Sequence, residues 1–201
     1  MIELPAIYTP EQLIEIQNYI AANFGSNKTD YIAHEIESNY IHTDVLIIDN
    51  KNDLKVFASM GMGARAMNTP DNNFNNIELI CFASQDLDVS SEETLLIANE
   101  IVRTTKFPFS DNTWFGPGHT INVSDDLKKQ FGYDYFLFLY SGFTTEISGI
   151  GNVNYLILIP LYSEERDWIV KNGNNTFLEM LLSNCGYETF IINKQRESIT
   201  L

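Results

Sequence analysis

Hydrophobic and polar positions alternate along residues 40–49, and the alternation predicts a β-strand. Even-numbered residues of this stretch share one face of the strand and odd-numbered residues share the other. A polar turn at 50–53 leads to the apolar run 54–60, which predicts a hairpin. After the polar loop 68–76, residues 77–83 form another predicted strand. The first half of the chain therefore supplies neighbouring strands of one sheet.

Apolar residues at helical spacing occur in the sequence both before and after these strands. Thr9 and Gln12 form a capping box around Pro10, which predicts a helix over about 10–24. A second box opens at Ser90 and predicts a helix that ends near Lys106. The other predicted elements are strands at 32–36, 134–141, 153–162 and 187–193, helices at 163–170 and 175–183, and a glycine-rich turn region at 142–152. No linker divides them. The pattern predicts an α+β fold, a single domain over 1–201 with a central mixed β-sheet flanked by helices.

The net charge says more about possible partners than the overall composition does. Hydrophobic residues make up 44% of the 201-residue chain and charged residues 19%, which is ordinary for a globular protein. The 27 acids outnumber the 12 bases, and the net charge is −15. Such a surface repels phosphate backbones and anionic membranes, so we expect neither nucleic acid nor membrane as a partner. The acidic balance suits a basic protein partner, and it is equally typical of a protein that is merely soluble.

The two cysteines and the first residues bear on location. Cys81 and Cys185 both lie in apolar surroundings without metal-type spacing, which indicates buried free thiols in a reducing compartment. The first residues lack a basic region followed by a long apolar run, and no apolar run is long enough to span a bilayer. The sequence therefore predicts a cytoplasmic protein.

Titratable residues are found in a defined order only on the predicted strands. His42 and Asp44 are two positions apart and so share a strand face, while Glu78 lies on a strand that we expect nearby. His119 lies in a Gly-Pro-Gly-His turn. These four residues have the side-chain types that hold zinc, so one hypothesis is a metal-assisted hydrolase. The alternative is a polar seam with a structural role, and the pattern favours this alternative.

The glycine loop after the second strand does not match a known phosphate loop. Gly61, Met62 and Gly63 lack the GK[ST] ending of a P-loop and the third glycine of a dinucleotide fingerprint. Arg65 has two interpretations, a ligand for a carboxylate or a partner of a nearby acid. No nucleophile motif appears in the chain. The sequence thus indicates no catalytic residue, no cofactor and no resident metal.

An acidic turn follows the predicted strand at 153–162. Glu164 and Glu165 open the next helix, where carboxylates favour the helix dipole. This explains them structurally. They are also candidates for contacting a basic partner.

These motifs, taken in order, resemble the Suppressor of fused (SUFU) domain family. The matching residues are His42 and Asp44 in an H-x-D strand, Ser59–Met62 with Met67, Glu78-Leu79, the turn at 114–120 that contains His119, and Ile159–Tyr162 followed by Glu164 and Glu165. They span about residues 34–196. His42, Asp44, Gly61, Met62, Arg65, Glu78, His119, Glu164 and Glu165 are therefore signature or binding candidates.

The resemblance implies a SUFU-like α+β domain that binds proteins and is not an enzyme. In animals the fuller protein of this family clamps a transcription-factor peptide between two lobes, partly by strand addition. A chain of 201 residues lacks room for the second lobe. It looks like a stand-alone bacterial member, several of which are proposed immunity proteins. The expected partner is a basic toxin or a peptide strand.

Overall fold

One mixed β-sheet runs through the computed structural model, which describes residues 5–24, 29–32, 40–50, 54–70, 74–193 and 196–199. The strands are β1 (Thr29–Ile32), β2 (Asp44–Asp49), β3 (Leu54–Met60), β4 (Ile77–Ser84), β5 (Thr120–Asn122), β6 (Tyr135–Ile147), β7 (Gly151–Leu161) and β8 (Ile191–Ile192). Their order is β1-β2-β3-β4-β7-β6-β5, and β8 pairs with β4 beyond the residues that pair with β7. Pairing is antiparallel except where β4 meets β7 and β8. The predicted mixed sheet is confirmed.

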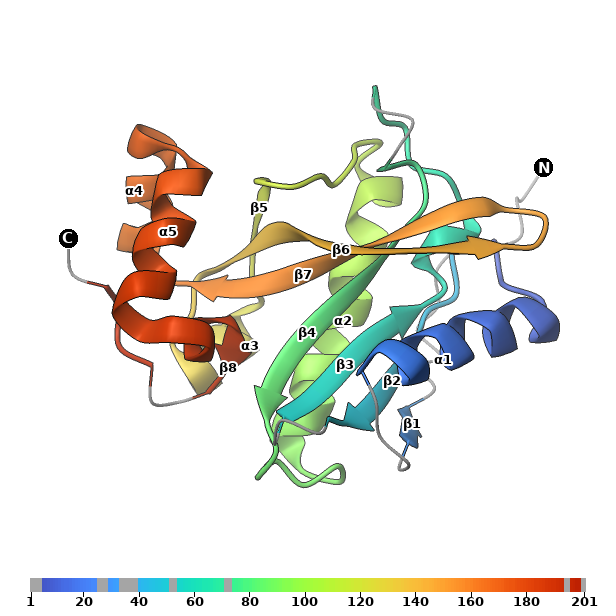
Figure 1. The fold of residues 1–201 in the computed structure, drawn as a ribbon, viewed down its shortest axis with the longest axis horizontal. Coiled ribbons are helices and arrows are strands. Elements are labelled where there is room, and N and C mark those ends of the chain that lie inside the picture. Colours follow the sequence, from blue (N-terminus) through green and yellow to red (C-terminus); the bar gives the residue numbers. More distant parts are fainter. Residues whose placement is uncertain are drawn as a thin grey trace.

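Helices cover this sheet on both faces. They are α1 (Pro10–Phe24), α2 (Glu92–Ser110), α3 (Asp125–Phe131), α4 (Ser163–Asn172) and α5 (Asn174–Cys185), with 3-10 turns at Met62–Ala64 and Gly186–Phe190. Figure 1 shows α1 in front of β2 and β3, and α2 behind the sheet. The fold is a single α+β domain, as predicted. No helix within the described residues is both long and apolar enough to cross a bilayer.

The central strands carry apolar residues at both odd and even positions because both of their faces are buried. Val45 and Ile47 of β2 join the core beneath α2, whereas Leu46 and Ile48 join the core beneath α1. All four side chains are at most 1% exposed. This two-sided burial explains why the strand contains hydrophobic residues at both odd and even positions.

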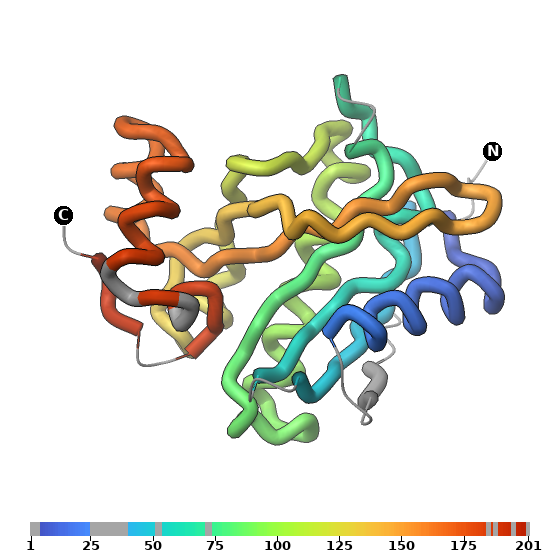
Figure 2. The backbone as a smooth tube through the Cα atoms, in the orientation of Figure 1, coloured from blue at the N-terminus to red at the C-terminus, as the bar shows by residue number. Residues whose placement is uncertain are grey.

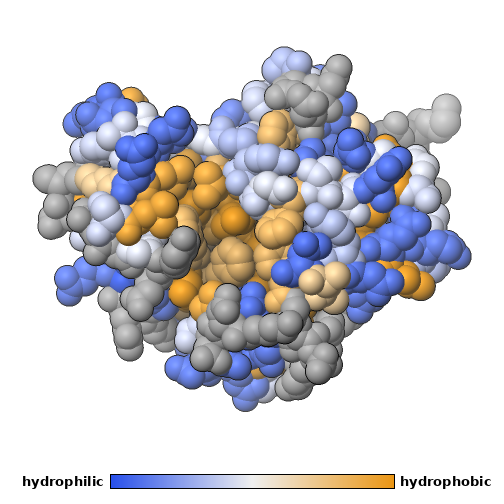
Figure 3. All heavy atoms as spheres, viewed as in Figure 1, coloured by the Kyte–Doolittle hydropathy of each residue, from blue (hydrophilic) through white to orange (hydrophobic). Residues whose placement is uncertain are grey.

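A third core lies where α4 and α5 cover one end of the sheet. Its buried members are Leu137, Ile159, Leu161, Ile169, Phe177, Leu181 and Ile199. Figure 2 shows these helices at one end of the molecule and the β6–β7 turn at the other. Ile157 contacts both this core and the core beneath α1. Figure 3 shows apolar atoms gathered in a hollow on this face, between the end that α4 and α5 cover and the part that α1 covers.

Several predicted boundaries differ from the structure. The predicted capping box around Pro10 is present, since Gln12 N donates to Thr9 Oγ1 and Thr9 N donates to Gln12 Oε1. The second helix, however, passes Lys106 and includes Pro108. Pro108 lies in the last turn and is buried, and the helix ends at Ser110 with Asp111 as its C-cap.

The β6–β7 hairpin is much longer than predicted. The turn region expected at 142–152 is largely strand, because a bulge between Tyr140 and Thr144 lets β6 continue. At this bulge the Ser141 hydroxyl donates to the carbonyl of Tyr155 and accepts from Phe143 N. Gly142 there has a φ of 78°, a conformation that glycine adopts without strain.

Two other predicted strands also need correction. The strand expected at 187–193 is a 3-10 turn followed by the two residues of β8. The one expected at 32–36 is found as β1, earlier in the chain, and positions 33–36 lie outside the described residues.

Candidate functional site

Glu78 is the hub of the segment that the sequence singled out. Its side chain is fully buried on β4, and four donors surround the carboxylate. Oε1 accepts from Tyr8 Oη, Gly61 N and Gly63 N, each at 2.9 Å. Oε2 accepts from the Ser59 hydroxyl, which itself accepts from Leu79 N at 2.8 Å. The carboxylate thus ties the N-terminal segment, β3 and the glycine loop to β4.

Both glycines of the loop are required because neighbouring atoms lie where a Cβ atom would be. Gly61 has a φ of 145°, and a Cβ built on it would lie 1.9 Å from the carbonyl oxygen of His42. A Cβ on Gly63 would lie 2.3 Å from Tyr8 Oη and 3.3 Å from Glu78 Oε1. Any larger residue would therefore break the arrangement that places the loop N–H groups on Glu78. Met62, between the two glycines, is completely buried in the core beneath α2.

His42 and Asp44 make the contact that their spacing predicts. His42 Nε2 lies 3.2 Å from Asp44 Oδ1, and the Asp44 side chain is almost completely buried. Thr43 between them points to the opposite face, where its hydroxyl lies 3.1 Å from that of Thr105 on α2. The pair thus borders the Gly61 loop.

Arg65 lies in an aromatic setting. Its guanidinium lies 6.0 Å from the ring centroid of Tyr40 and 5.9 Å from that of Phe109, within cation–π range. The sequence indicated a carboxylate partner but gave no sign of these rings, because Phe109 lies beyond Lys106, where the helix was expected to end.

The four residues of the hydrolase hypothesis are not brought together. His119 lies before β5, which β6 and β7 separate from β4, and its ring contacts Trp114 at a centroid distance of 4.4 Å. The Glu78 oxygens are occupied by the donors described above. Across the residues that the structure describes, no three His, Cys, Asp or Glu side chains form a group that could hold a metal ion. The structure joins only His42 to Asp44.

The acidic turn separates into one exposed and one buried residue. Glu164 is exposed at the start of α4. Glu165 is buried, and its carboxylate accepts hydrogen bonds from both terminal nitrogens of Arg196, at 2.6 and 2.7 Å. It also accepts hydrogen bonds from the backbone N–H groups of Tyr162 and Ile199. Glu165 therefore fixes the C-terminal tail from inside the molecule, and only Glu164 presents a carboxylate to a partner.

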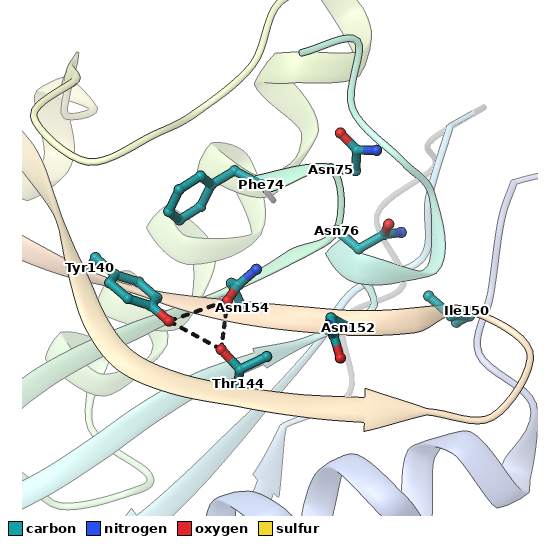
Figure 4. Close-up of a pocket in the computed structure, with 8 residues that line it drawn as sticks. All are labelled: Phe74, Asn75, Asn76, Tyr140, Thr144, Ile150, Asn152 and Asn154. Carbon is teal, nitrogen blue, oxygen red and sulfur yellow. Dashed lines mark hydrogen bonds between the residues drawn. The ribbon is translucent and has the colours of Figure 1, made fainter. Parts of the chain in front are cut away.

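A polar hollow of about 600 Å³ lies next to the glycine loop, and we call it the asparagine pocket. It is lined by Phe74, Asn75, Asn76, Tyr140, Thr144, Ile150, Asn152 and Asn154 (Figure 4). Asn76 Nδ2 donates to the carbonyl of Gly63 at 2.7 Å, and Asn154 N donates to the carbonyl of Asn76 at 3.0 Å. The loop that Glu78 holds thereby positions one wall of the pocket.

Burial dominates the electrostatics of the hub. It raises the pKa of the Glu78 carboxyl, although hydrogen bonds from Ser59, Gly61, Gly63 and Tyr8 lower that pKa in part. Burial also raises the pKa of the Tyr8 and Tyr155 hydroxyls, and the nearby Glu78 charge adds to both shifts. The Tyr155 hydroxyl is buried and has no hydrogen-bond partner in the described structure. These groups form an internal cluster rather than one exposed to solvent.

Two parts of this site carried no usable sequence signal. Tyr8 is 70 positions from Glu78, and a single tyrosine before a helix does not indicate a buried contact. The asparagines of the pocket belong to a polar loop and a strand that are far apart in the chain. Only the pairing of β4, β7 and β6 brings them together.

The fold and the hub define a class of protein: an α+β domain with a mixed sheet whose glycine loop is held by a buried carboxylate. The family model described as "Suppressor of fused protein (SUFU)" matches residues 39–197. The chain belongs to this family, so the resemblance seen in the motifs is confirmed. A comparison with curated protein sequences finds no match.

Two solved structures share the fold. A chain of the "Sufu-Fu complex crystal structure" has a TM-score of 0.69 and 11% sequence identity, with 96% of this chain and 92% of that chain covered. The crystal structure of Drosophila Suppressor of Fused has a TM-score of 0.58 and 12% identity, with 79% of this chain and 42% of that chain covered. At such identities the likeness concerns the fold alone.

Proposed function

We propose that this chain is a non-enzymatic protein-binding domain, and specifically an immunity protein that neutralises a basic toxin. Membership of the SUFU family carries the first part of the proposal, since the family model covers most of the chain. A chain solved in a complex of Sufu with Fu has a similar fold, so the same architecture supports protein binding elsewhere.

The acidic surface supports the second part. Exposed carboxylates include those of Glu11, Asp86, Asp88, Glu92, Asp111, Asp125, Asp126, Glu146, Glu164, Asp167, Glu179 and Glu197. A surface of this kind attracts a basic partner over long range and speeds its association. A toxin that acts on nucleic acid is commonly basic, because it must bind phosphate. We propose that the partner is of this type and that the protein acts in the cytoplasm.

The test is binding to the basic proteins encoded next to this chain's gene. We expect tight binding in isothermal titration calorimetry at low salt, weakening as salt is raised, and rescue of growth when toxin and chain are produced together. If no neighbour-encoded protein binds at low salt, the immunity role is wrong.

Two variants locate the contact. Glu164→Gln with Asp167→Asn removes exposed charge from α4, and Asp125→Asn with Asp126→Asn removes the same charge from the first turn of α3. If Glu164 lies in the interface, the α4 variant slows association more than the α3 variant. Equal effects would mean that α4 contributes only to the overall charge.

A further inference from the structure

The asparagine pocket combines dense hydrogen-bonding capacity with a lack of charge. None of its eight lining residues is ionisable near neutral pH, in a chain with a net charge of −15. Four of the eight are asparagines, and each carboxamide carries both a donor and an acceptor. The pocket volume of about 600 Å³ is within the usual range of ligand sites.

Contacts within the protein orient the walls of the pocket. Asn76 is fixed by the Gly63 carbonyl, as described above. Asn154 Oδ1 accepts from the hydroxyl of Thr144 at 2.6 Å, and the hydroxyl of Tyr140 lies 3.5 Å from the same oxygen (Figure 4). Phe74 meets the Tyr140 ring edge-on, at 5.6 Å and 88°. Groups held in this way lose little conformational entropy when a ligand binds.

The chemistry of the lining selects among ligand classes. A phosphate, carboxylate or ammonium group would give up water here without meeting an opposite charge. A purely apolar group would desolvate the carboxamides without replacing their hydrogen bonds. A group that both donates and accepts suits the lining, and a carboxamide or peptide unit does so with the same geometry as asparagine itself.

We propose that the asparagine pocket binds an uncharged, amide-bearing stretch of a partner polypeptide, through its main-chain amides and an Asn or Gln side chain. This inference rests on the protein-binding function proposed above and gives that function a contact point. Long-range attraction by the acidic surface and short-range recognition by the pocket are then separate properties of the chain.

The test uses the full chain labelled with ¹⁵N and two blocked tripeptides, N-acetyl-Gly-Asn-Gly-amide and N-acetyl-Gly-Asp-Gly-amide. We expect saturable shifts of the Asn76, Asn152 and Asn154 signals with the asparagine peptide. Binding of the aspartate peptide should be at least about tenfold weaker, because its carboxylate has no counter-charge in the pocket. Glucose is the third probe, since hydroxyl-rich sugars also pair with amides.

Matched variants separate a local effect from one of net charge. Asn152→Asp adds one charge to the pocket, and Asn99→Asp adds the same charge to an exposed position on α2. We expect Asn152→Asp to weaken the asparagine peptide at least about fivefold and Asn99→Asp to leave its binding unchanged. Equal binding of both tripeptides, saturation by glucose alone, or no saturable shift at all would overturn the proposal.

The same variants distinguish failure of this inference from failure of the proposed function. If the basic neighbour-encoded protein binds the wild-type and Asn152→Asp chains equally, the pocket is not its contact, while the immunity role stands. If the asparagine peptide binds and every neighbour-encoded protein fails, the pocket stands and the immunity role does not.

Discussion

Glu78 looks like a candidate for chemistry in the sequence, whereas in the fold its carboxylate is hydrogen-bonded within the protein. A carboxylate near His42 and Asp44 has the right chemistry for a reaction, but its two oxygens accept from four donors inside the protein. Those donors come from the N-terminal segment, β3 and the glycine loop. The residue therefore joins segments that are distant in the chain, and we expect its replacement to lower the free energy of unfolding.

The first prediction compares two substitutions of Glu78. Glu78→Ala leaves the two hydroxyls and two N–H groups without acceptors in a buried site, so we expect a loss of at least about 3 kcal/mol in the free energy of unfolding. Glu78→Gln retains an oxygen for the Oε1 donors and loses chiefly the Ser59 bond, so we expect a loss of about 1–2 kcal/mol. Urea denaturation measures both. Equal losses would contradict the account of the hub.

The raised pKa of Glu78 gives the stability a pH dependence of known sign. Its pKa lies above the ordinary value near 4.5, chiefly because of burial, so the folded chain holds this proton more tightly than the unfolded chain. The contribution of Glu78 to stability is therefore greatest below the ordinary value. It falls as pH rises from there through the folded pKa, and then levels off.

The Glu78→Gln variant cannot titrate at this position and serves as the reference. We expect the stability of the wild type, measured relative to this variant, to decline over that window in urea denaturation between about pH 4 and pH 8. Other titrating groups cancel in the difference. A difference that grows with pH would mean that the donors outweigh burial and lower the pKa.

At the scale of elements, the C-terminal tail is fastened by an internal ion pair. Arg196 and Glu165 have side chains at most 4% exposed, and Arg196 also donates to the carbonyl of Pro160 at 2.7 Å. The guanidinium lies 5.0 Å from the ring centroid of Tyr162 and 5.5 Å from that of Tyr133. The pair thus joins the tail to the end of β7 and the start of α4.

Breaking one half of this pair should cost more than removing both halves. We expect Arg196→Met to lower the free energy of unfolding by about 3–5 kcal/mol, because Glu165 is left buried without its counter-charge. The double variant Glu165→Met with Arg196→Met should recover much of that loss. Arg166→Met, which removes the partly exposed partner of Asp167, is the control and should change stability by less than about 1 kcal/mol. Additive losses in the double variant would argue against coupling.

The elements also show how far the sequence determines the fold. The strands around 40–60 and 77–83 were predictable because their apolar runs are long and are bounded by polar turns. The extent of β6 was not, since it depends on the Ser141 hydroxyl bonding across to Tyr155 at the bulge. The contact of His42 with Asp44 agrees with the predicted alternation of side chains, although β2 itself begins at Asp44 and not at position 40. The Tyr8 bond to Glu78 depends on tertiary packing and has no local signal.

For the whole molecule, the distribution of acids matters more than their number. Asp44, Glu78, Glu100 and Glu165 are buried and bonded within the protein, so they add little to the surface field. The remaining carboxylates repel one another across the surface and oppose compaction. The same field that attracts a basic partner therefore costs the isolated chain some stability.

This shared origin predicts opposite responses to salt. Between about 20 and 300 mM NaCl, screening should raise the thermal midpoint of the isolated chain by about 2–4 °C, the shift that 1 kcal/mol gives at this size. Over the same range, affinity for the basic partner should fall at least about tenfold, mainly through slower association. Differential scanning calorimetry and stopped-flow mixing measure the two effects. A midpoint that falls with salt would show that attractive ion pairs outweigh repulsion, and an association rate indifferent to salt would exclude steering by the acidic surface.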